Sequence, residues 1–187
     1  IPSDEYVPLG TESLKGQFAY RAEIEIYRRK VTALIVYNPE LEKGQLQGIL
    51  INREKTTKKL LDLQQKLIHR ANGKITKGKK PTKSSITKKA EDILKVEYMK
   101  SIFHYEVIES KGHIYLTFAS SDEALKQLQE QELGKKVLFT DRSDFTNEVI
   151  VNAYRSMLTH TQYDIFCRYR NLYLPHFICP YLIQIKL

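Results

Sequence analysis

Alternating apolar and polar positions near the start of the chain predict a β-hairpin. Ala22, Ile24 and Ile26 alternate with polar neighbours, which is the pattern of a strand with one buried face. The apolar run that follows predicts its antiparallel partner, and a second pair of apolar runs predicts another hairpin later in the chain. We place the four strands at 18–27, 31–37, 102–108 and 113–118.

Apolar residues spaced three or four apart predict the helices. The longest spans 40–69 and is followed by a second at 86–98, and the two are expected to pair. The seam of the long helix is formed by Leu46, Leu50, Leu60 and Leu67 and is widened by Ile49, Leu61 and Ile68. Two more helices are expected at 120–133 and from 146 through Tyr154, with a short buried strand, 136–141, between them.

These elements predict a fold of the α/β class with mixed α and β structure. No run of about 18 apolar residues occurs, so no membrane-spanning helix and no membrane partner are expected. The two cysteines, Cys167 and Cys179, are too few for a disulfide framework, which favours a cytoplasmic location.

Positive charge is concentrated in one segment between the two helices. The chain has 30 basic and 22 acidic residues, a formal charge of +8, and segment 73–89 has seven lysines and no acid. These lysines are Lys74, Lys77, Lys79, Lys80, Lys83, Lys88 and Lys89. Lysine ammonium groups bind phosphates without reading base sequence, so a basic loop that contacts nucleic acid is one interpretation. A solvated linker explains the same composition, because the segment has no aromatic residue to stack on a base.

Composition changes abruptly after Met157. The last 30 residues, 158–187, contain no Glu and no Gly but have both cysteines. They also have six aromatics, namely Tyr163, Phe166, Tyr169, Tyr173, Phe177 and Tyr181. The tail is either an aromatic-rich packing segment or the product of a frameshift.

The residues alone do not define an active site. No phosphate-cradling glycine loop and no nucleophile elbow occurs. His176 and Cys179 are three residues apart, but Pro180 and the missing further ligands argue against zinc. Asp141 and Asp144 follow a predicted strand, where metal-binding carboxylates can lie, although capping is the commoner role of acids in a turn.

Several phrases resemble the DDE transposases of bacterial and archaeal insertion sequences, in the branch with a β-rich insertion before the final catalytic glutamate. The most specific is GKKVLFTDRSDFTNEVIVNAYRS, at 134–156. The others are IPSDEYVPL at 1–9, VTALIVYNPEL at 31–41, GQLQGIL at 44–50 and KKAEDILK at 88–95.

The resemblance implies a partial ribonuclease H-like core with a β-rich and helical insertion. It divides the chain into an insertion-like region (1–133), a core strand and helix (134–157) and the atypical tail (158–187). In the intact family, two aspartates and a glutamate hold two Mg²⁺ ions that act on DNA phosphodiesters. The family binds its transposon ends and usually acts as a dimer, so DNA and a homodimer are the expected partners.

Residue by residue, the catalytic carboxylates do not carry over. The two aspartates of the family would precede Ile1. Tyr154 matches the tyrosine of the family's signature helix, but Met157 and Thr161 stand where the arginine and the glutamate would follow. The pattern is lost where composition changes, which favours the frameshift interpretation. We therefore expect a transposase fragment for DNA transposition, without a catalytic residue or a bound metal of its own. The alternative is a non-catalytic nucleic-acid-binding module that uses the lysines.

Overall fold

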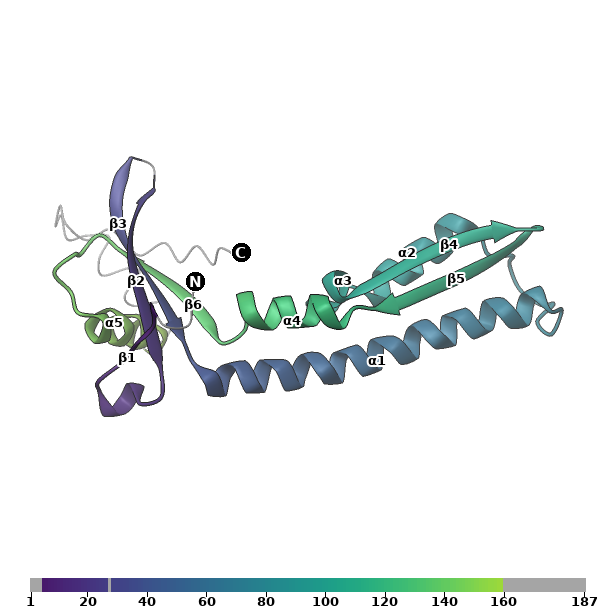
Figure 1. Cartoon of the computed structure of the whole chain (residues 1–187). Coiled ribbons are helices and arrows are strands. Elements are labelled where there is room, and N and C mark those ends of the chain that lie inside the picture. The colour runs from purple at the N-terminus through teal and green to yellow at the C-terminus, as the bar shows by residue number, and fades with distance from the viewer. Residues whose placement is uncertain (1–4, 27, 160–187) are drawn as a thin grey trace. The chain divides into compact units, whose positions relative to one another are not determined.

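The computed structural model describes residues 5–26 and 28–159, and this part of the chain has a mixed α and β fold, as predicted (Figure 1). In chain order its elements are β1 (Val7–Pro8), the short 3-10 helix η2 (Glu12–Leu14), β2 (Phe18–Ile26), β3 (Arg29–Tyr37), α1 (Pro39–Ala71), α2 (Lys83–Ile93), α3 (Met99–Ile102), β4 (Phe103–Ser110), β5 (His113–Ser120), α4 (Asp122–Gln131), β6 (Lys135–Thr140) and α5 (Asn147–Thr159). Segment 160–187, which holds nearly all of the predicted atypical tail, lies outside the described residues.

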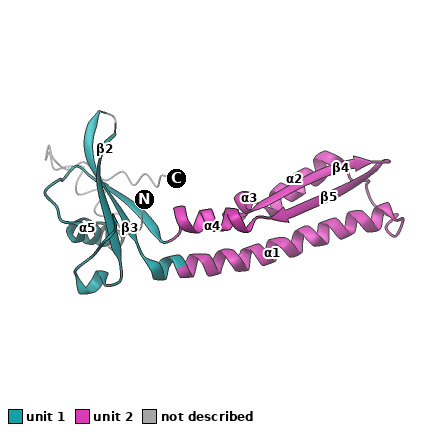
Figure 2. Cartoon of the chain, viewed as in Figure 1, with its two compact units in different colours: residues 1–42, 134–187 teal, residues 43–133 magenta. Residues whose placement is uncertain are grey.

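The chain forms two compact units (Figure 2). Unit 1 comprises residues 1–42 and 134–187, and unit 2 comprises residues 43–133. Unit 2 is therefore inserted between β3 and β6. The domain boundary expected at 133/134 grouped β2 and β3 with the helix pair. The structure groups these strands with β6 and α5 instead, because β3 and β6 are hydrogen-bonded neighbours in one sheet.

Unit 1 is an antiparallel sheet with the strand order β1-β2-β3-β6. Leu34 of β3 lies opposite Leu138 of β6, and both belong to a buried cluster with Ile150 and Val151 of α5. Ile24, which the alternation placed on a buried face, is 37% exposed. The reason is that Ile24 and Ala19 are five residues apart on β2, so their side chains lie on opposite faces of the sheet, and the buried cluster includes Ala19.

Unit 2 packs its helices against a two-stranded antiparallel sheet made of β4 and β5. Its buried cluster draws on every element of the unit, and no member comes from unit 1. The completely buried side chains of this cluster include Leu60, Ile86, Met99, Ile102 and Leu133. Unit 2 therefore has a hydrophobic core of its own.

The buried stripe of α1 differs from the predicted seam. Leu50, Leu61 and Ile68 are each more than 40% exposed, whereas their neighbours Ile49, Leu60 and Leu67 are buried. A one-residue step turns the chain by about 100° around a helix axis, which is enough to move a side chain off the stripe. The fourth buried position is a polar residue, Thr56.

The second helix begins earlier than predicted and ends sooner. The side chains and backbones of Thr82 and Ser85 form a reciprocal capping box, which starts α2 at Lys83. Tyr98 has a φ of +66° and separates α2 from the short helix α3. As a consequence, Lys83 lies on α2 together with Lys88 and Lys89, and the basic loop is shorter than expected.

Within the described ranges, none of the helices is both long enough and apolar enough to cross a membrane.

Candidate nucleic-acid interface

The loop between α1 and α2 is folded back onto the last turn of α1. The backbone N–H groups of Lys74 and Ile75 both donate to the carbonyl oxygen of His69, at 2.9 and 3.3 Å. The Arg70 guanidinium donates to the carbonyl oxygen of Lys77 at 2.9 Å and, at 3.4 Å, to that of Gly78. These contacts fix the backbone of the lysine-rich segment, so its side chains project from a defined chain path.

Two glycines permit the reversals of this path. Gly73 has a φ of +71° and Gly78 a φ of +92°, values that side-chain-bearing residues rarely adopt. Gly73 lies two residues after Ala71, the last residue of α1, where glycine commonly terminates a helix. The sequence signals for a loop at this point were therefore correct.

All seven predicted lysines are exposed. The structure brings Lys74, Lys77, Lys79 and Lys80 together on the loop and places the other three on α2. In the described part of the chain, none of the seven forms a salt bridge with a carboxylate. Unpaired ammonium groups on an ordered backbone are available to an external polyanion at no cost in broken ion pairs.

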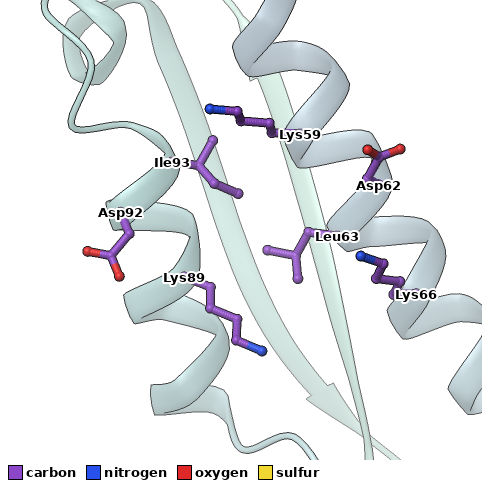
Figure 3. Close-up of a pocket in the computed structure, with 7 residues that line it drawn as sticks. All are labelled: Lys59, Asp62, Leu63, Lys66, Lys89, Asp92 and Ile93. Atoms are coloured by element: carbon purple, nitrogen blue, oxygen red, sulfur yellow. The ribbon is translucent and has the colours of Figure 1, made fainter.

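Two lysines of α1 that sequence reasoning missed join this surface through a groove between α1 and α2 (Figure 3). The groove has a volume of about 370 Å³ and is lined by Lys59, Asp62, Leu63 and Lys66 of α1 and by Lys89, Asp92 and Ile93 of α2. Lys59 and Lys66 were not singled out because α1 carries both signs of charge along its length. Their spacing of seven residues, two helical turns, was the available signal.

Tyr154, the family-motif match, lies on α5 in unit 1. Its side chain is partly buried and packs against the cluster formed by Leu34, Leu138 and Ile150. This position gives Tyr154 a packing contact in the sheet–helix core.

Two arginines contact the turn that contains Asp141 and Asp144. Arg142 donates to both carboxylate oxygens of Asp144 at 2.9 Å, and this contact lowers the pKa of Asp144. Arg21 of β2 donates to the carbonyl oxygens of Phe145 and Ser143 at 2.6 and 2.8 Å. Asp144 therefore forms an ion pair with Arg142.

Among the residues that the structure describes, no three His, Cys, Asp or Glu side chains gather in a way that could hold a metal ion. His176 and Cys179, the pair considered for zinc, lie outside the described residues. The described side chains therefore do not provide the three carboxylates that two Mg²⁺ ions would need.

Comparison of the chain with protein-family models, with curated proteins and with solved structures found no match.

Proposed function

We propose that the lysine-rich end of unit 2 binds the phosphate backbone of DNA, and that the chain is a portion of a DDE transposase that contributes this contact to DNA transposition. The observation that carries the proposal is a set of seven exposed lysines that form no salt bridge with any described residue, on a loop held by Arg70 and on the adjoining helix. DNA is the abundant polyanion that such a surface attracts without sequence readout.

The transposase part of the proposal rests on the motif resemblance, and unit 1 supports it. The phrase at 134–156 forms a strand, β6, in which Leu138 is buried, and a helix, α5, that packs on it. This is the strand–helix order expected of a partial ribonuclease H-like core. The described carboxylates do not fit a two-metal site.

The test is the salt dependence of binding to a short mixed-sequence DNA duplex. If about four phosphates are contacted, the logarithm of the binding constant should fall with the logarithm of salt at a slope near −3 to −4. Replacing Lys77, Lys79, Lys80 and Lys83 with Gln should remove most of that slope, as measured by fluorescence anisotropy.

A matched control has the same change in charge at four exposed lysines elsewhere. These are Lys30, Lys43, Lys58 and Lys100, each replaced with Gln. The control should keep the wild-type slope. If both variants lose slope equally, or neither does, the lysine-rich segment is a solvated linker and the proposal fails.

The second candidate is a nucleic-acid-binding module that belongs to no transposase, for which the separate core of unit 2 is the supporting observation. The nucleotide sequence on both sides of the reading frame distinguishes the two. An in-frame upstream aspartate pair, or a downstream Glu-x-x-Phe in another frame, would favour the transposase. A flanking sequence with neither would favour the module.

A further inference from the structure

The groove between α1 and α2 combines an apolar floor with a cationic rim. Leu63 and Ile93 are partly buried and pack against the core of unit 2, so they form the floor. Figure 3 shows the ammonium groups of Lys66 and Lys89 extending into the gap between the helices, and that of Lys59 above Ile93. The three ammonium groups thus surround a space that no described side chain fills.

The two carboxylates of the groove do not cancel this charge. Asp92 pairs with Lys95 at 2.6 Å, and this contact lowers the pKa of Asp92. In Figure 3 the carboxylate groups of Asp62 and Asp92 point away from the gap between the helices. The groove lining together with Lys95 contains four ammonium groups and two carboxylates, a net charge of +2.

The groove is continuous with the lysine-rich segment. Lys89, on its rim, is six residues along α2 from Lys83, at the end of the loop. A polyanion that contacts the loop can therefore extend along the same helix pair. The carboxylate of Asp92, which it would pass, is already paired with Lys95.

We propose that the groove is a phosphate-binding subsite in which Lys59, Lys66 and Lys89 hold an oxyanion between α1 and α2. The ligand class is a phosphate of a polyanion, either the backbone of the bound nucleic acid or a free polyphosphate. The inference rests on the proposed function, and it adds a second anchoring point, on the body of unit 2, to the contact made by the loop. The ammonium groups supply charge, and the apolar floor keeps water from part of the ligand surface, which strengthens the attraction.

The test uses the full chain with Lys59 and Lys66 both replaced with Gln. Because each phosphate contact contributes about 0.9 to the salt slope on duplex DNA, the double variant should lower the magnitude of the slope by about 1. Lys43 and Lys58, exposed on the same helix but absent from the groove lining, provide the matched control when both are replaced with Gln. Far-UV circular dichroism verifies that both variants retain the helical content of the wild-type chain.

The outcomes separate the subsite from the function on which it rests. An unchanged slope in the groove variant, with a loss in the loop variant, overturns the subsite and leaves DNA binding standing. No loss in either variant overturns both. An equal loss in the groove variant and its control shows an effect of net charge alone and also overturns the subsite.

The source of the phosphate is resolved by NMR titration with two probes, the DNA duplex and inorganic tripolyphosphate. Backbone amide shifts at Lys59, Lys66 and Lys89 with both probes support a subsite for nucleic-acid phosphates. Shifts with tripolyphosphate alone support the free polyphosphate as ligand and overturn the second DNA anchor. Shifts with neither probe overturn the subsite.

Discussion

At the scale of single residues, Gly134 has a demanding position because the chain re-enters unit 1 there beside its point of exit. Its φ is +72°, and an added Cβ would lie 2.7 Å from the Glu42 Cβ and 2.8 Å from the Asn38 carbonyl oxygen. The carbonyl of Gly134 also accepts a hydrogen bond from the backbone N–H of Asn38 at 2.8 Å. A side chain at this position has no space without moving backbone.

We predict that Gly134→Ala lowers the free energy of unfolding by about 3 kcal/mol, the sum of left-handed backbone strain and overpacking. Urea unfolding of the full chain measures it. Gly112→Ala is the control, since Gly112 has a φ of +73° but open space around it. It should cost only about 1–2 kcal/mol, and an equal loss in the two variants would contradict the steric argument.

Glu148 gives the first turn of α5 a pH-dependent contact. Two backbone N–H groups lower the pKa of the Glu148 carboxyl. The larger effect comes from the N–H of Glu148 itself, and the second comes from the N–H of Gly10, which donates to Glu148 Oε1 at 3.2 Å. A carboxyl with a lowered pKa in the folded state stabilises the fold above its ordinary titration range. That contribution disappears as the pH falls through the lowered value.

We predict that Glu148→Gln destabilises the chain by about 0.5–1 kcal/mol at pH 7, the usual value of a charge at a helix N-terminus. The difference from wild type should be smaller at pH 3 than at pH 7, because lowering the pH moves the carboxyl of Glu148 toward its protonated form. Urea midpoints at both pH values test this. Glu54→Gln, at an exposed position of α1, is the control and should show no such pH-dependent difference.

At the scale of elements, α1 contacts the rest of unit 2 through a narrow stripe of side chains, some of which are polar. Arg53, on this side of the helix, donates to the Ser120 hydroxyl at 2.8 Å and pairs with Asp122 at 2.6 Å. Gln64 donates to the Leu116 carbonyl oxygen at 2.7 Å. Asp122 is 84% exposed, so its ion pair contributes little, and the apolar members of the stripe supply most of the packing energy.

We predict that Leu60→Ala costs about 2–5 kcal/mol, because Leu60 is completely buried and its truncation leaves a cavity. Leu61→Ala, one residue further on and 42% exposed, should change stability by less than about 1 kcal/mol. Thermal and urea unfolding of the pair are the measurements. A comparable loss of stability in Leu61→Ala would show that Leu61 belongs to the packed face of α1, as the sequence pattern predicts.

At the scale of the whole molecule, the insertion of unit 2 between β3 and β6 has a consequence for folding. The buried cluster of unit 2 lies entirely within residues 49–133. A segment with its own core can fold without the chain on either side.

We predict that residues 39–133, expressed alone, unfold cooperatively in urea and bind duplex DNA with the salt slope of the full chain. The fragment includes all of α1 and all seven lysines. The same fragment with Leu60→Ala serves as the destabilised reference. A gradual, non-cooperative unfolding curve would show that unit 2 depends on unit 1.

The elements that depend on short segments of the chain could be predicted from the sequence. The positive φ values at Lys111 and Gly112 and the cap at Ser121 are properties of short segments, so the second hairpin and α4 were placed close to their observed bounds. The concentration of lysines between two helices also needed no tertiary information. The proposed DNA contact was therefore located by composition alone.

Tertiary packing decided which apolar residues are buried and which lysines meet. Ile24 alternates as a buried strand residue should, but it is exposed because the cluster that packs against α5 lies on the opposite face of the sheet. Leu60 and Leu61 are equally apolar, and only the direction from which β5 and α2 approach α1 separates them. Lys59 and Lys66 join Lys89 across a groove only because α1 and α2 pair. Sequence periodicity fixes angles around one axis, whereas burial and convergence depend on where the partner elements lie.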